Sequence, residues 1–120
     1  MTVVVAADSG AGMFSPKDPA GSEYYYWDFS NWLQPTESIT SALVTSTNNV
    51  DNSDNTATMI LEASTVLNNV VVRQKIAAGS SGQIYRMTAD AITLDSVTGL
   101  TQKLPLSALL PIEPVYGVMA

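Results

Sequence analysis

The sequence predicts an all-β fold, and we expect an antiparallel β-sandwich of about six or seven strands. Ser and Thr together number 25, whereas only 13% of the 120 residues are charged. Thr favours strands because its branched Cβ packs on a pleated surface, and Ser, Thr and Asn disfavour helices because they compete for backbone hydrogen bonds. Turn signals recur about every 8–12 residues, and no amphipathic helices alternate with the expected strands. This length suits one domain.

The expected strands are stretches of β-branched or alternating apolar residues that end at turn signals. They are residues 23–29, 38–47, 56–62, 69–77, 83–94 and 101–110. Residues 63–69 are ambiguous and admit a helical turn. The alternation in the fifth segment predicts an inner face made of Tyr85, Met87, Ala89 and Ala91. Pro105 removes a backbone donor and therefore predicts an edge position for the last strand.

The two ends are expected to lie outside the folded core. We divide the chain into an N-terminal arm at residues 1–15, the sandwich at residues 16–110 and a C-terminal tail at residues 111–120. The apolar run at residues 3–5 admits an irregular first strand as an alternative to an arm. Both ends carry apolar groups on segments that Gly and Pro interrupt, and exposed apolar surface of this kind marks intermolecular contacts. We therefore expect both ends to be mobile in the isolated chain and ordered against neighbouring subunits. The residues expected to make these contacts are Val3, Val4, Val5, Phe14, Val115, Tyr116, Val118 and Met119.

A block of aromatic residues within residues 24–32 admits two interpretations. Alternation along a strand sends about half of the rings into the core and half outward. Because exposed Tyr and Trp side chains dominate protein interfaces, Tyr24 and Trp27 join the expected contact residues. The alternative is a sugar-binding platform, which needs Trp27 and Trp32 to be exposed. In the first interpretation Trp32 and Leu33 pack in the core.

The composition argues against several classes of function. The net charge is −6 and the five basic residues are scattered, so we expect no binding to nucleic acid or to a membrane. Cysteine and histidine are both absent, which removes disulfides, thiolate metal sites and the commonest general base. We expect no enzyme activity, no catalytic residues, no metal and no cofactor. The first residues lack the basic segment and long apolar run of a signal peptide, so we expect no secretion by that route.

Two acidic arrangements have simple explanations. The carboxylates available for acid–base chemistry are Asp28, Glu37, Asp90 and Asp95. Nothing in the sequence pairs any two of them, so we expect solvated surface or turn residues. The loop that contains Asp51, Ser53 and Asn55, with Glu62 eleven residues after Asp51, resembles part of a calcium-binding EF-hand, but Thr56 stands where that loop needs Gly. Its acidic residues are expected to form turns.

Four short motifs follow one another along the chain. They are Lys17-Asp18-Pro19, then Tyr25 with the block DFSNWL at residues 28–33, then ESITS at residues 37–41, and finally Gly79, Gly82 and Tyr85 at the start of a long strand. Together they resemble a family of small tailed-phage proteins, the fibre–tail adaptors, over roughly residues 16–110. The sharpest part is DFSNWL followed closely by ESITS. The N-terminal arm and the C-terminal tail are additions to the family's pattern.

The resemblance implies an immunoglobulin-like β-sandwich that sits in the virion, joins the tail or baseplate of a bacteriophage to its fibres, and carries no catalytic residues. Tyr85, three residues after Gly82, likewise resembles the tyrosine corner of immunoglobulin-like domains. We accordingly expect a structural virion protein, made in the host cytoplasm, that assembles as a homo-oligomer with other virion proteins. The alternatives are a host-surface or carbohydrate-binding module and a capsid or head–tail connector decoration protein.

Overall fold

The computed structural model describes residues 3–6 and 12–113, and for residues 3–6 it describes the backbone only. Eight strands and one short helix lie within these residues. In chain order they are β1 (Val3–Ala6), β2 (Gly12–Met13), β3 (Glu23–Asp28), β4 (Glu37–Asn48), α1 (Thr56–Met59), β5 (Thr65–Leu67), β6 (Val71–Ile76), β7 (Ile84–Asp95) and β8 (Thr101–Pro111).

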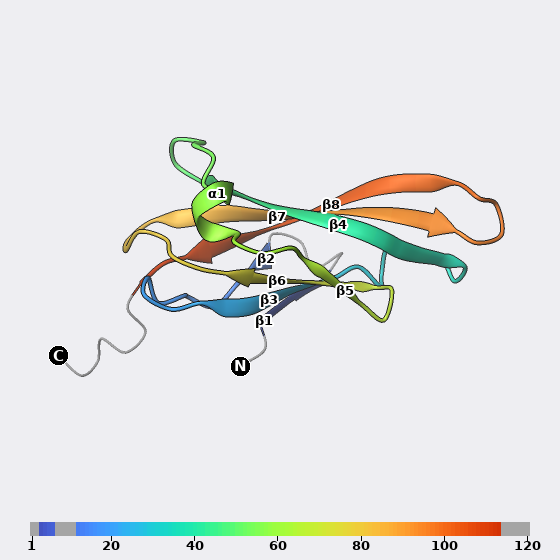
Figure 1. Cartoon of the computed structure of the whole chain (residues 1–120), viewed down its shortest axis with the longest axis horizontal. Coiled ribbons are helices and arrows are strands. Elements are labelled where there is room, and N and C mark those ends of the chain that lie inside the picture. The colour runs from blue at the N-terminus through green and yellow to red at the C-terminus, as the bar shows by residue number, and fades with distance from the viewer. Residues whose placement is uncertain (1–2, 7–11, 114–120) are drawn as a thin grey trace.

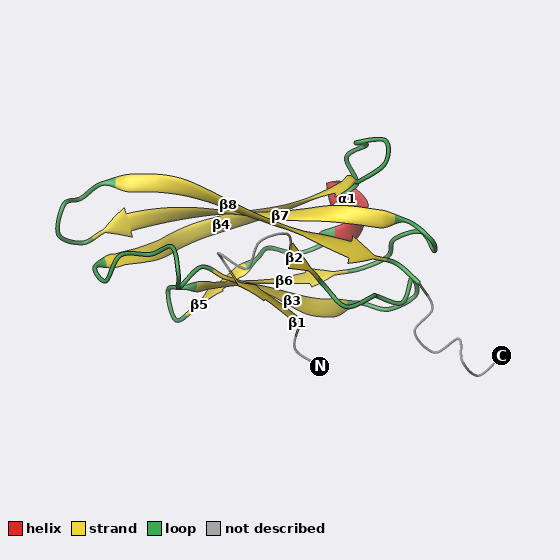
Figure 2. Ribbon diagram, turned by 180° about the vertical axis from the view of Figure 1, so that it is seen from behind, coloured by secondary structure: helices red, strands yellow, loops and turns green. Residues whose placement is uncertain are grey.

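The strands form two four-stranded sheets that lie one above the other (Figure 1). The β3–β6 sheet, in the lower layer, has the strand order β1-β3-β6-β5. The β7–β8 sheet, in the upper layer, has the order β2-β8-β7-β4 and contains the three longest strands. The expectation of an all-β fold is therefore confirmed. The view from behind shows strands in both layers and the short helix at one end (Figure 2).

Two edge strands depart from the expected antiparallel arrangement. β1 runs parallel to β3, with Val3 opposite Tyr25, and β2 runs parallel to β8, with Gly12 opposite Ala108. The pairs β3–β6, β5–β6, β4–β7 and β7–β8 are antiparallel. Two parallel strands need a long connection between them. The residues between β1 and β3 form such a connection, and they include β2, which belongs to the other sheet. The expectation of a wholly antiparallel fold is wrong at these two edges.

The core lies between the sheets, where buried side chains of β3 and β6 meet those of β4, β7 and β8. The inner face predicted for β7 is confirmed, since Tyr85, Met87, Ala89 and Ala91 are all buried. Pro105 lies in the half of β8 that precedes its pairing with β2, so among the described residues its outer edge has no neighbouring strand. The predicted edge position is therefore confirmed for that half of the strand.

Residues 56–59 form a helical turn where we expected a strand. The side chain of Asp54 accepts a hydrogen bond from the Thr56 N–H at 3.0 Å, and the Asn55 carbonyl accepts one from the Met59 N–H at 3.1 Å. The turn places the Met59 side chain in the core, where it is almost fully buried. These bonds outweigh the strand preference of the local sequence. The ambiguous segment at residues 63–69 contains β5.

The core extends past the expected limits of residues 16 and 110. Phe14 is 2% exposed and Ile112 is 1% exposed, so both are core residues. The N–H of Ile112 donates to the Gln83 carbonyl at 2.9 Å, which fastens this part of the chain beside the start of β7. Within the described residues the expected arm is packed too, because β1 and β2 are paired strands. Residues 1–2, 7–11 and 114–120 lie outside the described residues.

Candidate docking surfaces

The expected contact residues fall into three groups. Phe14 and Trp27 lie in the core, with their ring centroids 5.1 Å apart and nearly perpendicular, and Trp27 is 0% exposed. The expectation that these two residues contact a partner is therefore wrong. For Trp27, the alternation along β3 separates the side chains into two sides but does not show which side faces the core. Tyr24, by contrast, is exposed. For Val3, Val4 and Val5 the structure describes only the backbone of β1, and Val115, Tyr116, Val118 and Met119 lie outside the described residues.

Trp32 and Leu33 are partly buried and pack against the core, Trp32 with its ring centroid 6.1 Å from that of Phe29. The carboxylate of Asp28 accepts a hydrogen bond from the Ser30 N–H at 2.9 Å and so caps the turn that follows β3. The DFSNWL block is thus a turn that closes one end of the fold.

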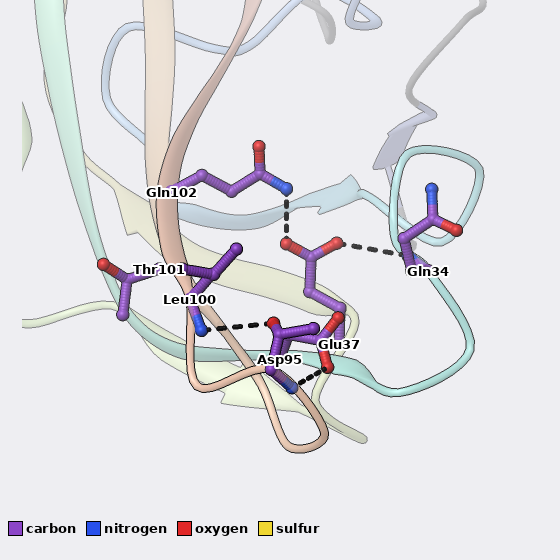
Figure 3. A pocket seen from close by; sticks show the side chains of 7 residues that line it. Gln34, Glu37, Asp95, Leu100, Thr101 and Gln102 are labelled. Atoms are coloured by element: carbon purple, nitrogen blue, oxygen red, sulfur yellow. Dashed lines mark hydrogen bonds between the residues drawn. The ribbon is translucent and has the colours of Figure 1, made fainter.

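Two of the four candidate carboxylates line one surface cavity of about 260 Å³ (Figure 3). Glu37 enters it from the start of β4 and Asp95 from the end of β7, two positions that are paired in the sheet. Gln34, Leu100 and Gln102 complete much of its wall. Asp28 and Asp90 do not line this cavity. Asp90 lies instead 3.8 Å from Lys103 in a salt bridge on the β7–β8 sheet.

Three donors hold the carboxylate of Glu37. It accepts hydrogen bonds from the Thr93 hydroxyl at 2.6 Å, from the Gln102 amide at 2.5 Å and from the Gln34 N–H at 3.1 Å. These bonds, that of Thr93 above all, lower the pKa of Glu37 below the usual value. Figure 3 shows the carboxylate pointing between Gln102 and Gln34. An ionised group held in this way ties β4 to β7, to β8 and to the turn before β4, which is a structural role.

The side chain of Asp95 stabilises the turn that follows β7. Its side chain accepts hydrogen bonds from the Val97 N–H at 2.8 Å, the Thr98 N–H at 3.2 Å and the Thr36 hydroxyl at 2.9 Å. The first of these is the main reason that the pKa of Asp95 is lowered. The cavity therefore contains two carboxylates that stabilise chain turns. Neither has the raised pKa that a general acid requires.

The end of the β7–β8 hairpin exposes apolar side chains. Leu94 near the end of β7 is exposed, as are Val97 and Leu100 on the connection to β8, and this connection lies at one end of the molecule (Figure 1). The neighbouring edge of β8 is protected against strand addition. Alternate residues of a strand direct their backbone groups toward the same edge. The carbonyls of Leu109 and Pro111 point toward the β2 side, so the backbone groups of Lys103, Pro105 and Ser107 point to that edge as well. A lysine and a proline there disfavour pairing with another chain.

The outer face of the β3–β6 sheet carries what we name the tyrosine–cation face: Tyr24, Tyr26, Arg73 and Lys75. Tyr25 and Trp27 face the core, so their neighbours on β3 face outward, and Tyr24 is paired with Lys75 and Tyr26 with Arg73. The guanidinium carbon of Arg73 lies 4.7 Å from the Tyr24 ring centroid, and the Lys75 ammonium lies 5.9 Å from it. Within residues 12–113 neither cation takes part in a salt bridge.

The connection after β4, which we name the acidic loop (residues 49–54), projects from the body of the molecule beyond α1 (Figure 1). Its carboxylates form turns as predicted: Asp51 accepts from the Ser53 N–H at 2.9 Å and Asp54 from the Thr56 N–H at 3.0 Å. Hydrogen bonding by the side chains of Ser53 and Thr56, and then by these backbone groups, lowers the pKa of both carboxyls, so both are ionised at neutral pH. Val50 is 80% exposed.

The described residues contain no cluster of three carboxylates placed to hold a metal ion. Within the same part of the chain, no helix has the length and apolar character needed to cross a bilayer.

The family comparison agrees with the motifs. A family model described as the podophage GP4 fiber-tail adaptor protein gp77 matches residues 17–102, from the Lys17-Asp18-Pro19 motif to the start of β8. Searches of curated proteins and of solved structures found no match to the chain.

Proposed function

Because this chain belongs to the podophage GP4 fiber-tail adaptor family, we propose that it is a structural subunit of the phage tail that holds the fibres in place as several copies around the tail. The observation that carries the proposal is the family match over residues 17–102. The partners under this proposal are other virion proteins. The protein acts in the virion after synthesis in the host cytoplasm, with no catalytic step and no role for nucleic acid or membrane.

The matched motifs support a role as a rigid joint, because their residues build the frame of the fold. Lys17 is buried and bonds to the turn before β7, Phe29 is in the core, and Glu37 ties three strands together. Residues of this kind do not reach a partner. The contacts with tail and fibre therefore fall on the exposed surfaces and on segments outside the matched range.

An immunoglobulin-like arrangement is part of the proposal. It is supported by Tyr85, whose hydroxyl accepts a hydrogen bond from the Ser80 N–H at 3.0 Å, the kind of bond to upstream backbone that defines a tyrosine corner. The two parallel edge strands are additions to that arrangement.

The carbohydrate-binding alternative loses its main support. A sugar platform needs flat exposed rings, whereas Trp27 is fully buried and Trp32 packs against Phe29. Among the described residues the exposed tyrosine is Tyr24, and the Arg73 guanidinium lies over its ring. Tyr and Arg together are typical of protein interfaces.

We propose that the C-terminal residues 114–120, with Val115, Tyr116, Val118 and Met119, are one docking segment, and that Val3, Val4 and Val5 contribute to another. The structure sharpens the test, because a truncation at residue 111 removes the buried Ile112. A chain that ends at residue 113 keeps Ile112 and its hydrogen bond to Gln83. We expect this chain to fold, as judged by circular dichroism and thermal midpoint, and to fail to enter particles.

A chain that ends at residue 111 is the matched control, and we expect its thermal midpoint to fall. Normal entry of the chain ending at residue 113 into fibre-bearing particles would show that the tail does not dock. A loss of folding in that chain would place residues 114–120 in the core instead.

A further inference from the structure

We propose that copies of this chain pack head to tail, with the acidic loop of one copy seated on the tyrosine–cation face of the next. The inference rests on the proposed function, because it names the surfaces through which the copies around the tail meet.

The receiving face has the chemistry of an anion-binding interface. The tyrosine–cation face contains two of the five basic residues of a chain whose net charge is −6. Of the other three, Lys17 is buried, Arg86 bonds to Asn49 and Asn52, and Lys103 pairs with Asp90. Within the described residues, Arg73 and Lys75 are thus the cations that are neither buried in the core nor joined by a hydrogen bond or salt bridge to another side chain. Tyr24 between them offers an apolar ring surface.

The acidic loop has the matching chemistry. Its exposed Val50 is flanked by the carboxylate of Asp51, with that of Asp54 three residues further on. The loop is ordered in advance: Asn48 accepts a hydrogen bond from the Val50 N–H at 2.8 Å, and Arg86 lies 3.3 Å from Asn49 and 3.4 Å from Asn52. An ordered loop loses little conformational entropy when it docks. The pairing places Val50 against a tyrosine ring and the carboxylates against Arg73 and Lys75.

The two surfaces lie on opposite sides of the molecule. In Figure 1 and in Figure 2 the acidic loop projects from the side of the β7–β8 sheet, while the β3–β6 sheet forms the other side. A loop and its receiving face placed in this way cannot satisfy each other within one copy. They make a heterologous contact, and repetition of such a contact closes a ring when the rotation between copies allows it. A ring of copies is the arrangement that a tail axis requires.

The C-terminal residues 114–120 are the other candidate occupant of this face. They carry no Asp or Glu side chain, whereas the acidic loop presents two carboxylates to Arg73 and Lys75. The charge of the face favours the loop. One contact of this size is small, and it gains strength when each copy in a closed ring makes two of them.

The test uses two variants of the full chain with opposite changes. In the face variant, Arg73→Glu and Lys75→Glu make the receiving face acidic. In the loop variant, Val50→Lys, Asp51→Asn and Asp54→Asn make the loop cationic, and each Asn keeps a side-chain oxygen for its turn bond. Each variant alone opposes like charges across the contact. In an equimolar mixture, every contact between one variant and the other again pairs opposite charges, so assemblies in which the two variants alternate are favoured.

Sedimentation velocity over a range of concentrations and salt measures the association, and circular dichroism confirms folding of each variant. We expect the wild-type chain to associate more weakly as salt rises, each variant alone to associate at least about tenfold more weakly, and the mixture to recover to within about threefold. Lys103→Glu changes the net charge by the same amount as Lys75→Glu but lies outside the receiving face. It is the control, and it should leave association unchanged, whereas Lys75→Glu should weaken it.

A wild-type chain that stays monomeric, or a mixture that associates no better than its parts, would overturn the proposal. Particle assembly separates this failure from that of the proposed function. If both variants still enter particles that bear fibres, the adaptor role stands and only the head-to-tail contact is wrong.

Discussion

The ammonium of Lys17 lies 2.6 Å from the carbonyl oxygen of Ala78, a residue 61 positions further along the chain. It also donates to the carbonyl of Asp18 at 2.8 Å, and its side chain is fully buried. Ala78 has a positive φ of 57°. The charged bond therefore fastens a strained turn to the segment that follows β2.

We predict that Lys17→Met lowers the free energy of unfolding by about 1–3 kcal/mol, because hydrogen bonds from a charged donor contribute roughly 1.5–3 kcal/mol. Chemical denaturation of the two chains measures the change. Lys75→Met, on the outer face, is the control and should change stability by less than about 0.5 kcal/mol. Equal effects of the two substitutions would contradict the role given to Lys17.

Gly79 has a left-handed backbone conformation and lies close to the side chain of Ile112. Its φ is +100°, and a Cβ at this position would lie 2.9 Å from two carbon atoms of Ile112. Gly82 in the same turn has a φ of +83° but no atom within 4 Å of such a Cβ. Both Gly→Ala changes incur backbone strain of about 1–2 kcal/mol, and only Gly79→Ala adds the steric conflict. We predict a lower thermal midpoint for Gly79→Ala than for Gly82→Ala, and the reverse order would show that Ile112 does not pack there.

Glu37 makes stability depend on pH. Its pKa is lowered in the fold by the hydrogen bonds from Thr93 and Gln102, so its ionised form stabilises the protein above the unfolded pKa of about 4.3. That contribution disappears as the pH falls through the lower, folded pKa. We predict that Glu37→Gln is less stable than wild type at pH 7 and that the difference narrows at acid pH. Glu62→Gln, at an exposed position, is the control. A difference that stays constant with pH would contradict the account.

The two tryptophans should differ in their contribution to stability. Trp27 is fully buried against Phe14, whereas Trp32 is only partly buried against Phe29. Trp27→Ala should lower the free energy of unfolding by about 3–5 kcal/mol and Trp32→Ala by about 1–2 kcal/mol. Urea denaturation followed by circular dichroism tests the order. A larger effect at Trp32 would contradict the burial of Trp27 in the core.

Much of the strand pattern follows from local sequence. The alternation that puts Tyr85 and Met87 inside is a property of the strand itself, so it is readable without the fold. The side of β3 that faces the core is not local. Tyr24 and Trp27 are both aromatic and three residues apart, and only the position of the other sheet decides that Trp27 is buried.

The missed features depend on distant partners. Residues 56–59 read as a strand, but the turn at Asp54 and the burial of Met59 fix a helix. Lys17 gives no local sign of burial, since its partner Ala78 lies far along the chain. The Asn and Asp residues of the acidic loop do predict a turn. Its position opposite the tyrosine–cation face emerges only in three dimensions.

The most direct test of the adaptor role compares phage particles made with and without this chain. Electron microscopy of the particles counts fibres on each tail, and the gene supplied in trans is the control. We predict that particles lacking the chain have complete heads and tails but no fibres, and that the wild-type gene restores them. Particles that keep their full set of fibres without the chain would contradict the account.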